Sequence, residues 1–109
     1  MNLDKIQDGD VCIITVNEAR IDAAVAIQFK DGIRELFHDG PDRIVVDLQQ
    51  VGFIDSSGLG AIVAAMKQQG EDRKLELASL TPAVEKVFRM TRMDTIFKIH
   101  DNLESIQTA

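Results

Sequence analysis

The chain has 109 residues, of which 45% are hydrophobic and 28% are charged, and these proportions are typical of a small globular protein. We therefore expect a single domain over residues 1–109 with enough apolar material for one core. The net charge is −6, and no basic cluster is longer than the pair at residues 73–74, which argues against nucleic-acid binding.

A lone cysteine and short apolar runs indicate the compartment. Cys12 has no second cysteine with which to form an internal disulfide, which favours a reducing environment. The polar N-terminal residues lack the apolar core of a signal peptide. The longest unbroken apolar stretch, residues 61–66, is too short to span a bilayer. These features predict a cytoplasmic protein that does not enter the membrane.

Two strands and a helix are predicted in the N-terminal part of the chain. Residues 1–7 have the weak pattern of an edge strand, whereas Val11–Val16 is almost entirely apolar and typical of a strand buried on both faces. From Ile21 to Leu36 apolar residues recur at spacings of three and four. This spacing predicts an amphipathic helix that begins near Asp22.

The rest of the chain alternates predicted strands with predicted helices. Strands are expected at residues 43–48, Lys74–Ala78 and 95–99. One helix is expected from the motif at residues 53–60 to Gly70, another from Thr81 as N-cap with Pro82 in first position, and a short one at 102–108. Because the helical connections are long enough to cross between parallel strands, this order predicts an α/β sandwich around a largely parallel sheet.

The stretch FIDSSGLG, residues 53–60, lies where a strand is followed by a helix, a common position for a site in an α/β sheet. It allows four interpretations: a helix cap, a phosphate cradle, a catalytic nucleophile or a phosphorylation site. One of Ser56 and Ser57 is expected to cap the helix by accepting a hydrogen bond from an unpaired backbone N–H. That interpretation leaves the other serine and the glycines unexplained.

Catalytic and cofactor chemistry has little support in the sequence. A P-loop would need a lysine after Gly60, and a dinucleotide-binding turn would need a third glycine. A hydrolase elbow would need a glycine where Ile54 or Asp55 stands. His38 and His100 are far apart, and no Cys/His cluster suggests a metal site. We therefore expect a protein that is not an enzyme, with no catalytic residue, cofactor or metal.

The predicted helix after the motif has an outer face of small residues. The apolar residues expected to face the core are Leu59, Ile62, Val63 and Met66. Angular arithmetic then turns another set outward: Ala61, Ala64, Ala65 and Gln68. Two interpretations stay open. Alanine is simply the best helix former, or this small, flat face is approached closely by a partner.

Four segments of the sequence carry a resemblance to a known family. They are VVDL at 45–48, VGFIDSSGLG at 51–60, ASLTPAV at 78–84 and FKI at 97–99. Together they resemble the STAS domains, and among these the stand-alone bacterial anti-sigma factor antagonists. The resemblance covers essentially the whole chain. It implies a STAS-like sandwich with a mixed, mostly parallel sheet of four to five strands and about four α-helices.

The resemblance implies a regulator of transcription that acts by partner switching. In that family the serine directly after the aspartate, Ser56 here, is phosphorylated by a partner that is both a serine kinase and an anti-sigma factor. The unphosphorylated antagonist binds this partner and thereby releases the partner's target. Phosphorylation ends the binding, and a metal-dependent serine phosphatase resets the antagonist. The free chain is expected to be a monomer.

Residues around Ser56 are expected to form the site and the partner surface. The site-adjacent residues are expected to be Asp22, Asp55, Ser57 and Gly58, with Asp22 matching an aspartate that the family places near the phosphorylated serine. The expected partner-binding residues lie on the following helix: Leu59, Gly60, Ala61, Ala64, Ala65 and Gln68.

Two departures from the family pattern fall outside the motif. The family often has glycine in the loop where this chain reads MTRMD, residues 90–94, and just before the first helix, where it reads NEAR, residues 17–20. The arginine of the MTRMD loop would pay a steric cost if its φ were positive.

An alternative function also stays open. The chain would be a STAS regulatory subunit of a transport or stress-sensing complex that is not switched by phosphorylation, and Ser56 would serve only as a helix cap.

Overall fold

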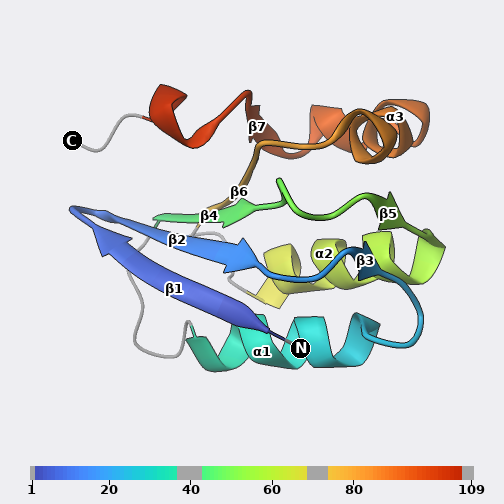
Figure 1. The fold of residues 1–109 in the computed structure, drawn as a ribbon, viewed down its shortest axis with the longest axis horizontal. Helices are drawn as coiled ribbons and strands as arrows, with labels where there is room; N and C mark the ends of the chain where they lie inside the picture. Colours follow the sequence, from blue (N-terminus) through green and yellow to red (C-terminus); the bar gives the residue numbers. More distant parts are fainter. Residues whose placement is uncertain (1, 37–42, 69–73, 107–109) are drawn as a thin grey trace.

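A five-stranded mixed sheet forms the centre of the computed structural model, which describes residues 2–36, 43–68 and 74–106 (Figure 1). Its strands lie in the order β1 (Leu3–Asp8), β2 (Val11–Val16), β4 (Arg43–Asp47), β6 (Lys74–Ala78) and β7 (Lys98–His100). The edge strand β1 is antiparallel to β2, and every other neighbouring pair is parallel. The predicted mostly parallel sheet, including its N-terminal edge strand, is confirmed.

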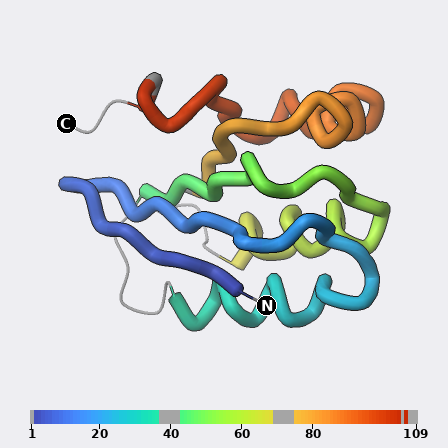
Figure 2. Tube along the Cα trace, in the orientation of Figure 1, coloured from blue at the N-terminus to red at the C-terminus, as the bar shows by residue number. Residues whose placement is uncertain are grey.

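A second, smaller sheet pairs β3 (Arg20–Ile21) in parallel with β5 (Phe53–Ile54). The helices of the described residues are α1 (Ala26–Leu36), α2 (Ser56–Gln68) and α3 (Pro82–Met90), with two 3₁₀ segments, η1 (Met93–Thr95) and η2 (Leu103–Ser105). The described chain therefore has three α-helices where about four were expected. In Figures 1 and 2, α1 and α2 lie together on one side of the sheet. The C-terminal segment, residues 101–106 with η2, lies on the other side.

The central strands are buried on both faces. Cys12 and Ile14 of β2 belong to the main core, together with the buried residues of α1 and α2. On the opposite face of the sheet, Val11 and Val45 pack with Ile106 from the C-terminal segment. Burial also raises the pKa of the Cys12 thiol. The expectation for Val11–Val16 is therefore confirmed, because both sets of alternating residues contribute to a core.

The predicted start of α1 is wrong, since the helix begins at Ala26 rather than near Asp22. Ile21 does face the core, but as a residue of β3 that is in register with Ile54 of β5. Asp22 then forms a turn, in which the backbone N–H of Val25 donates to the Asp22 carbonyl at 3.1 Å. Burial of Ile21 alone cannot distinguish a strand from the first turn of a helix, and its partner strand is distant in sequence.

The C-terminal elements are also shorter than predicted. The last strand is Lys98–His100 rather than residues 95–99, because Met93–Thr95 folds into η1. Of the helix expected at 102–108, the structure contains η2 at Leu103–Ser105, and residues 107–108 lie outside the described part of the chain.

The start of α3 confirms Pro82 in the first turn and Thr81 as the N-cap residue. The Thr81 hydroxyl, however, does not cap the helix. It donates to the Val51 carbonyl at 2.8 Å and so ties α3 to the segment that precedes β5.

Arg92 adopts the left-handed conformation, with φ 60° and ψ 21°, in the loop where the family often has glycine. A residue with a Cβ pays roughly 1–2 kcal/mol there, whereas glycine pays only a smaller entropic cost. Arg92→Gly is therefore expected to raise the free energy of unfolding by up to about 1 kcal/mol in urea titrations. Arg92→Ala, which keeps the Cβ, is the control and should give no gain. Equal stability of the two variants would contradict the claim that the backbone of Arg92 is strained.

Candidate functional site

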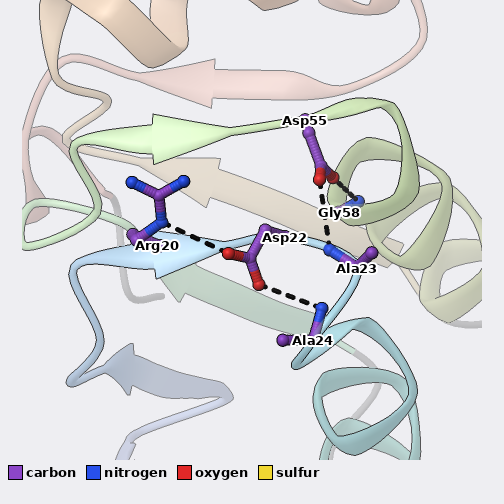
Figure 3. Close-up of polar contacts among 6 residues, drawn as sticks. All are labelled: Arg20, Asp22, Ala23, Ala24, Asp55 and Gly58. Carbon is purple, nitrogen blue, oxygen red and sulfur yellow. Dashed lines mark hydrogen bonds and ion pairs between the residues drawn. The ribbon is translucent and has the colours of Figure 1, made fainter.

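Asp55 is the N-cap residue of α2. The Leu59 backbone N–H donates to the Asp55 carbonyl at 2.9 Å, and the Gly58 N–H donates to Asp55 Oδ1 at 2.8 Å. The other carboxylate oxygen, Oδ2, accepts a hydrogen bond from the Ala23 N–H at 3.1 Å (Figure 3). The bond from Gly58 foremost, supported by that from Ala23 and opposed by desolvation, holds the pKa of the Asp55 carboxyl below its usual range. One carboxylate thus joins the turn after β3 to the start of α2.

The prediction that a serine caps α2 is therefore wrong. Because α2 begins at Ser56, both serines occupy the first helical turn, and they follow the capping position that Asp55 takes by one and two residues. Both are exposed, and neither hydroxyl has a hydrogen-bond partner among the residues that the structure describes. The two hydroxyls are open to solvent and to an approaching partner.

Asp22 lies at the same end of the β3–β5 pair as Asp55. Its Oδ1 accepts a hydrogen bond from the Ala24 N–H at 3.1 Å, and its Oδ2 lies 3.2 Å from Arg20 Nε (Figure 3). The guanidinium of Arg20 also stacks over the ring of Phe53, 4.1 Å from its centroid. Arg20 and Phe53 were not singled out from the sequence, because only the pairing of β3 with β5 brings them together.

The structure explains the two glycines of the motif differently. A Cβ on Gly58 would lie 1.9 Å from the Ile21 carbonyl oxygen, so this glycine lets the first turn of α2 pack against β3. A Cβ on Gly60 would meet nothing within 4 Å. Glycine inside a helix costs roughly 0.5–1 kcal/mol relative to alanine. The described fold gives no packing reason for accepting that cost at Gly60.

The predicted outward face of α2 is partly wrong. Ala61 and Ala65 are buried, at 7% and 0% exposure, while Ala64 is half-buried and Gln68 is exposed. The cause is the position of α2, which packs sideways against α1 as well as against the sheet. The angular arithmetic assumed a single buried face, and alanines on a second buried flank let two helices approach each other closely.

A hollow of about 220 Å³ lies on the surface between α1 and α2. We call it the α1–α2 hollow, and its lining residues are Ala26, Ile27, Lys30, Ser57, Gly60, Ala61 and Ala64. Four of the lining residues come from α2, and two of these, Gly60 and Ala64, are among the expected partner-binding residues that remain accessible. The contribution of α1 was not predicted, since nothing in its sequence indicates that it borders the motif.

The Asp55 cap makes a pH-dependent contribution to stability. Asp55→Ala is expected to lower the free energy of unfolding at neutral pH, because the first turn of α2 and the Ala23 turn lose a shared acceptor. Since the folded-state pKa is lowered, this stabilisation is present above the ordinary range of aspartate and is lost as pH falls through the lowered value. Urea titrations of both proteins at several pH values would measure the difference. The difference in unfolding free energy should disappear in acid, and a difference that widens in acid would contradict this assignment. Asp101→Ala, at an exposed aspartate, is the control and should lose little at neutral pH.

Comparison with known proteins identifies the class to which this fold and site belong. The STAS domain family model matches residues 2–106, so the chain belongs to the STAS domain family. A STAS-domain containing protein of Pseudomonas aeruginosa is 30% identical over 84% of this chain and 90% of its own length. The anti-sigma-F factor antagonist RsfB of Mycobacterium tuberculosis is 24% identical over 90% of this chain and 80% of its own.

A solved structure supports the fold independently. The crystal structure of an anti-sigma factor antagonist from Mycobacterium paratuberculosis superposes with a TM-score of 0.84 at 23% identity, covering 94% of this chain and 87% of that one. Among the residues that the structure describes, no helix is long and apolar enough to cross a membrane. The same residues contain no group of three or more His, Cys, Asp or Glu side chains arranged to hold a metal ion.

Proposed function

We propose that this chain is an anti-sigma factor antagonist that is switched by phosphorylation of Ser56. The unphosphorylated form binds an anti-sigma factor that is also a serine kinase, and the phosphorylated form does not. The observation that carries the proposal is the division of roles at the start of α2. Asp55 caps the helix, so the exposed Ser56 hydroxyl has no structural task within the described fold. The name of the RsfB relative supports the antagonist role.

The local electrostatics fit a modification that leaves the fold intact. A phosphoserine adds about −1.5 to −2 charges at neutral pH. At the N-terminus of α2 the helix dipole favours this charge by roughly 0.3–1 kcal/mol, whereas the carboxylate of the neighbouring Asp55 opposes it. These two effects act against each other at an exposed position, so the domain is expected to stay folded.

The balance differs across an interface. A dianion about 6 Å from one partner carboxylate, at an effective dielectric constant near 20, is repelled by roughly 5 kcal/mol before salt screening. Shifting a two-state equilibrium from 99:1 to 1:99 takes about 5.5 kcal/mol. Charge repulsion with the partner is therefore of the right size to end binding without a conformational change in this chain.

The partner surface that we propose is narrower than the sequence indicated. Gly60, Ala64 and Gln68 are accessible and lie on the helix that begins with Ser56. Leu59 is half-buried, and Ala61 is buried apart from its share in the lining of the α1–α2 hollow. Ala65 is buried and is left out.

The division of labour with the partners follows from this role. The kinase supplies the nucleotide and its magnesium, a metal-dependent serine phosphatase removes the phosphate, and this chain supplies the acceptor hydroxyl in the cytoplasm as a monomer without catalytic activity. In the alternative, a STAS regulatory subunit of a transport or stress-sensing complex that is not switched, Ser56 would only cap a helix. The Asp55 cap speaks against that role of Ser56.

The proposal predicts that Ser56→Asp weakens binding to the kinase by about tenfold or more. Its melting temperature should stay close to that of the wild type, because the added charge lies at an exposed helix N-terminus. Affinity capture with wild-type, Ser56→Ala and Ser56→Asp chains would identify the kinase, and titration calorimetry with the purified pair would measure the affinities.

Ser57→Ala is the matched control, and tandem mass spectrometry after phosphorylation should place the phosphate on Ser56. Phosphate on Ser57 alone would contradict the assignment. A loss of folding in Ser56→Asp that is large enough to explain the weaker binding would contradict the switch.

A further inference from the structure

The α1–α2 hollow joins an apolar surface to a single cation beside the motif. Ser57, the neighbour of Ser56, lies in its lining, so the hollow is continuous with the proposed phosphorylation site. We propose that the hollow receives an apolar side chain of the kinase, and that Lys30 pairs with a carboxylate next to that side chain. This inference rests on the proposed function and extends the partner surface from α2 to α1.

The apolar part of the hollow includes a large side chain that the fold leaves mostly exposed. Ile27 on α1 lines the hollow and is 70% exposed. A single exposed aliphatic residue is common on protein surfaces. Here, however, Ile27 lies beside a concave surface built from small residues, Ala26 and Ala64 among them. A concave apolar surface of this kind fits an inserted side chain, which would cover Ile27 as well.

Gly60 keeps this surface concave. Nothing in the described structure lies within 4 Å of the position that its Cβ would take. An alanine there would favour the helix and would partly fill the hollow. The glycine is thus unfavourable for the free chain and favourable for an occupant that comes close to the backbone of α2. This combination indicates a partner that enters the hollow rather than one that only touches its edge.

Lys30 indicates the charge that the occupant of the hollow carries. It is the one charged residue among those that line the hollow, and no carboxylate of the described residues lies within ion-pair distance of its ammonium group. On the same helix, Asp31 and Arg34 pair with each other at 3.5 Å. An unpaired cation at the edge of an apolar hollow is complementary to a carboxylate next to an apolar side chain. A second copy of this chain, with its net charge of −6, is the less favourable occupant.

The same carboxylate would explain how the phosphate acts. A kinase carboxylate that pairs with Lys30 would lie at the hollow. Ser57, which lines the hollow, is the chain neighbour of Ser56. Phosphate on Ser56 would repel that acid, while Lys30 would attract it. Attraction by Lys30 would then favour binding of the unphosphorylated chain, and repulsion by the phosphate on Ser56 would weaken binding of the phosphorylated chain.

Titration calorimetry with the purified kinase, identified by its transfer of phosphate to Ser56, tests the proposal. Ile27→Gln, Lys30→Glu and Gly60→Ala are each expected to bind about tenfold more weakly than the wild type. Gly60→Ala should also melt at a higher temperature, and a glycine with only a structural role would not combine a gain in stability with a loss of affinity. Lys86→Glu on α3 changes the net charge equally and should bind like the wild type.

A second measurement isolates the charge pair. The affinity of the wild type should fall as salt is added, and the affinity of Lys30→Gln should fall less steeply. Wild-type affinity of the Gly60→Ala and Lys30→Glu variants would overturn the inference, while weak binding by Ser56→Asp would leave the proposed function intact. A wild-type chain that binds no kinase would overturn both. Sedimentation of the free chain gives the remaining outcome, since a dimer that Gly60→Ala abolishes would assign the hollow to a second copy and overturn the proposal.

Discussion

Gly58→Ala is expected to destabilise the domain severely, because the new Cβ would lie 1.9 Å from the Ile21 carbonyl oxygen. That oxygen belongs to the backbone of β3, which pairs with β5, so it cannot move away as the end of a side chain would. Relief requires the first turn of α2 to shift, which also disturbs the hydrogen bond from the Gly58 N–H to Asp55. Overpacking of a well-packed site costs about 1–3 kcal/mol, and a backbone clash belongs at the upper end.

The matched control for Gly58→Ala is Gly60→Ala, two residues further along the same helix, where the added methyl group meets open space. Urea titration should show a loss of about 3 kcal/mol for the first variant and a gain of roughly 0.5–1 kcal/mol for the second. Circular dichroism would show whether the Gly58 variant folds at all. Equal stability of the two variants would mean that α2 does not approach β3 as closely as described.

Glu76→Gln is the second change with a large expected effect. Glu76 of β6 is only 3% exposed, and Arg43 of β4 donates to its two carboxylate oxygens at 2.6 and 2.9 Å. Nε2 of His100 on β7 lies 2.7 Å from Glu76 Oε1. Three neighbouring strands are thus joined through one carboxylate. Breaking a buried ion pair by removing one partner's charge costs about 3–5 kcal/mol, and the partial exposure of Arg43 places this variant near 3 kcal/mol.

The pH dependence of this cluster follows from the Glu76 pKa. Burial raises that pKa, but the hydrogen bonds and charges of Arg43 and His100 outweigh burial and hold it below its usual range. A lowered pKa means that the stabilisation is present above the ordinary range of glutamate and is lost as pH falls through the lowered value. The stability difference between wild type and Glu76→Gln should therefore shrink in acid.

Glu85→Gln is the matched control for Glu76→Gln, because Glu85 pairs with Arg89 at 3.9 Å on the exposed surface of α3. Exposed pairs of this kind contribute at most about 1 kcal/mol, and the control should therefore lose little. If chemical unfolding gave similar losses for the two variants, the Glu76 cluster would not be the constraint that the distances indicate.

The sequence by itself determined the strands of the central sheet and their order along the chain, apart from the exact position of the last strand, but it did not reveal the β3–β5 pair. Runs of β-branched residues such as Val11–Val16 can be buried on both faces only inside a covered sheet, and the helices between the strands make the neighbours parallel. The D-S-S-G-L-G motif also indicated the family, and the match over residues 2–106 confirms it. These features are local in the chain, because they depend on the composition of single segments and on their order.

Only the tertiary structure decided which residue of the motif caps α2, how the two glycines differ and which alanines of α2 are buried. Whether Asp55 or a serine caps α2 depends on where the helix begins and on the Ala23 turn that meets the same carboxylate. The difference between Gly58 and Gly60 depends on a carbonyl of β3, which is remote in sequence. The burial of Ala65 depends on the sideways contact between α1 and α2. Each of these depends on contacts between segments far apart in the chain, which periodicity within one helix cannot encode, whereas the hydrophobic pattern of a strand is complete in its own residues.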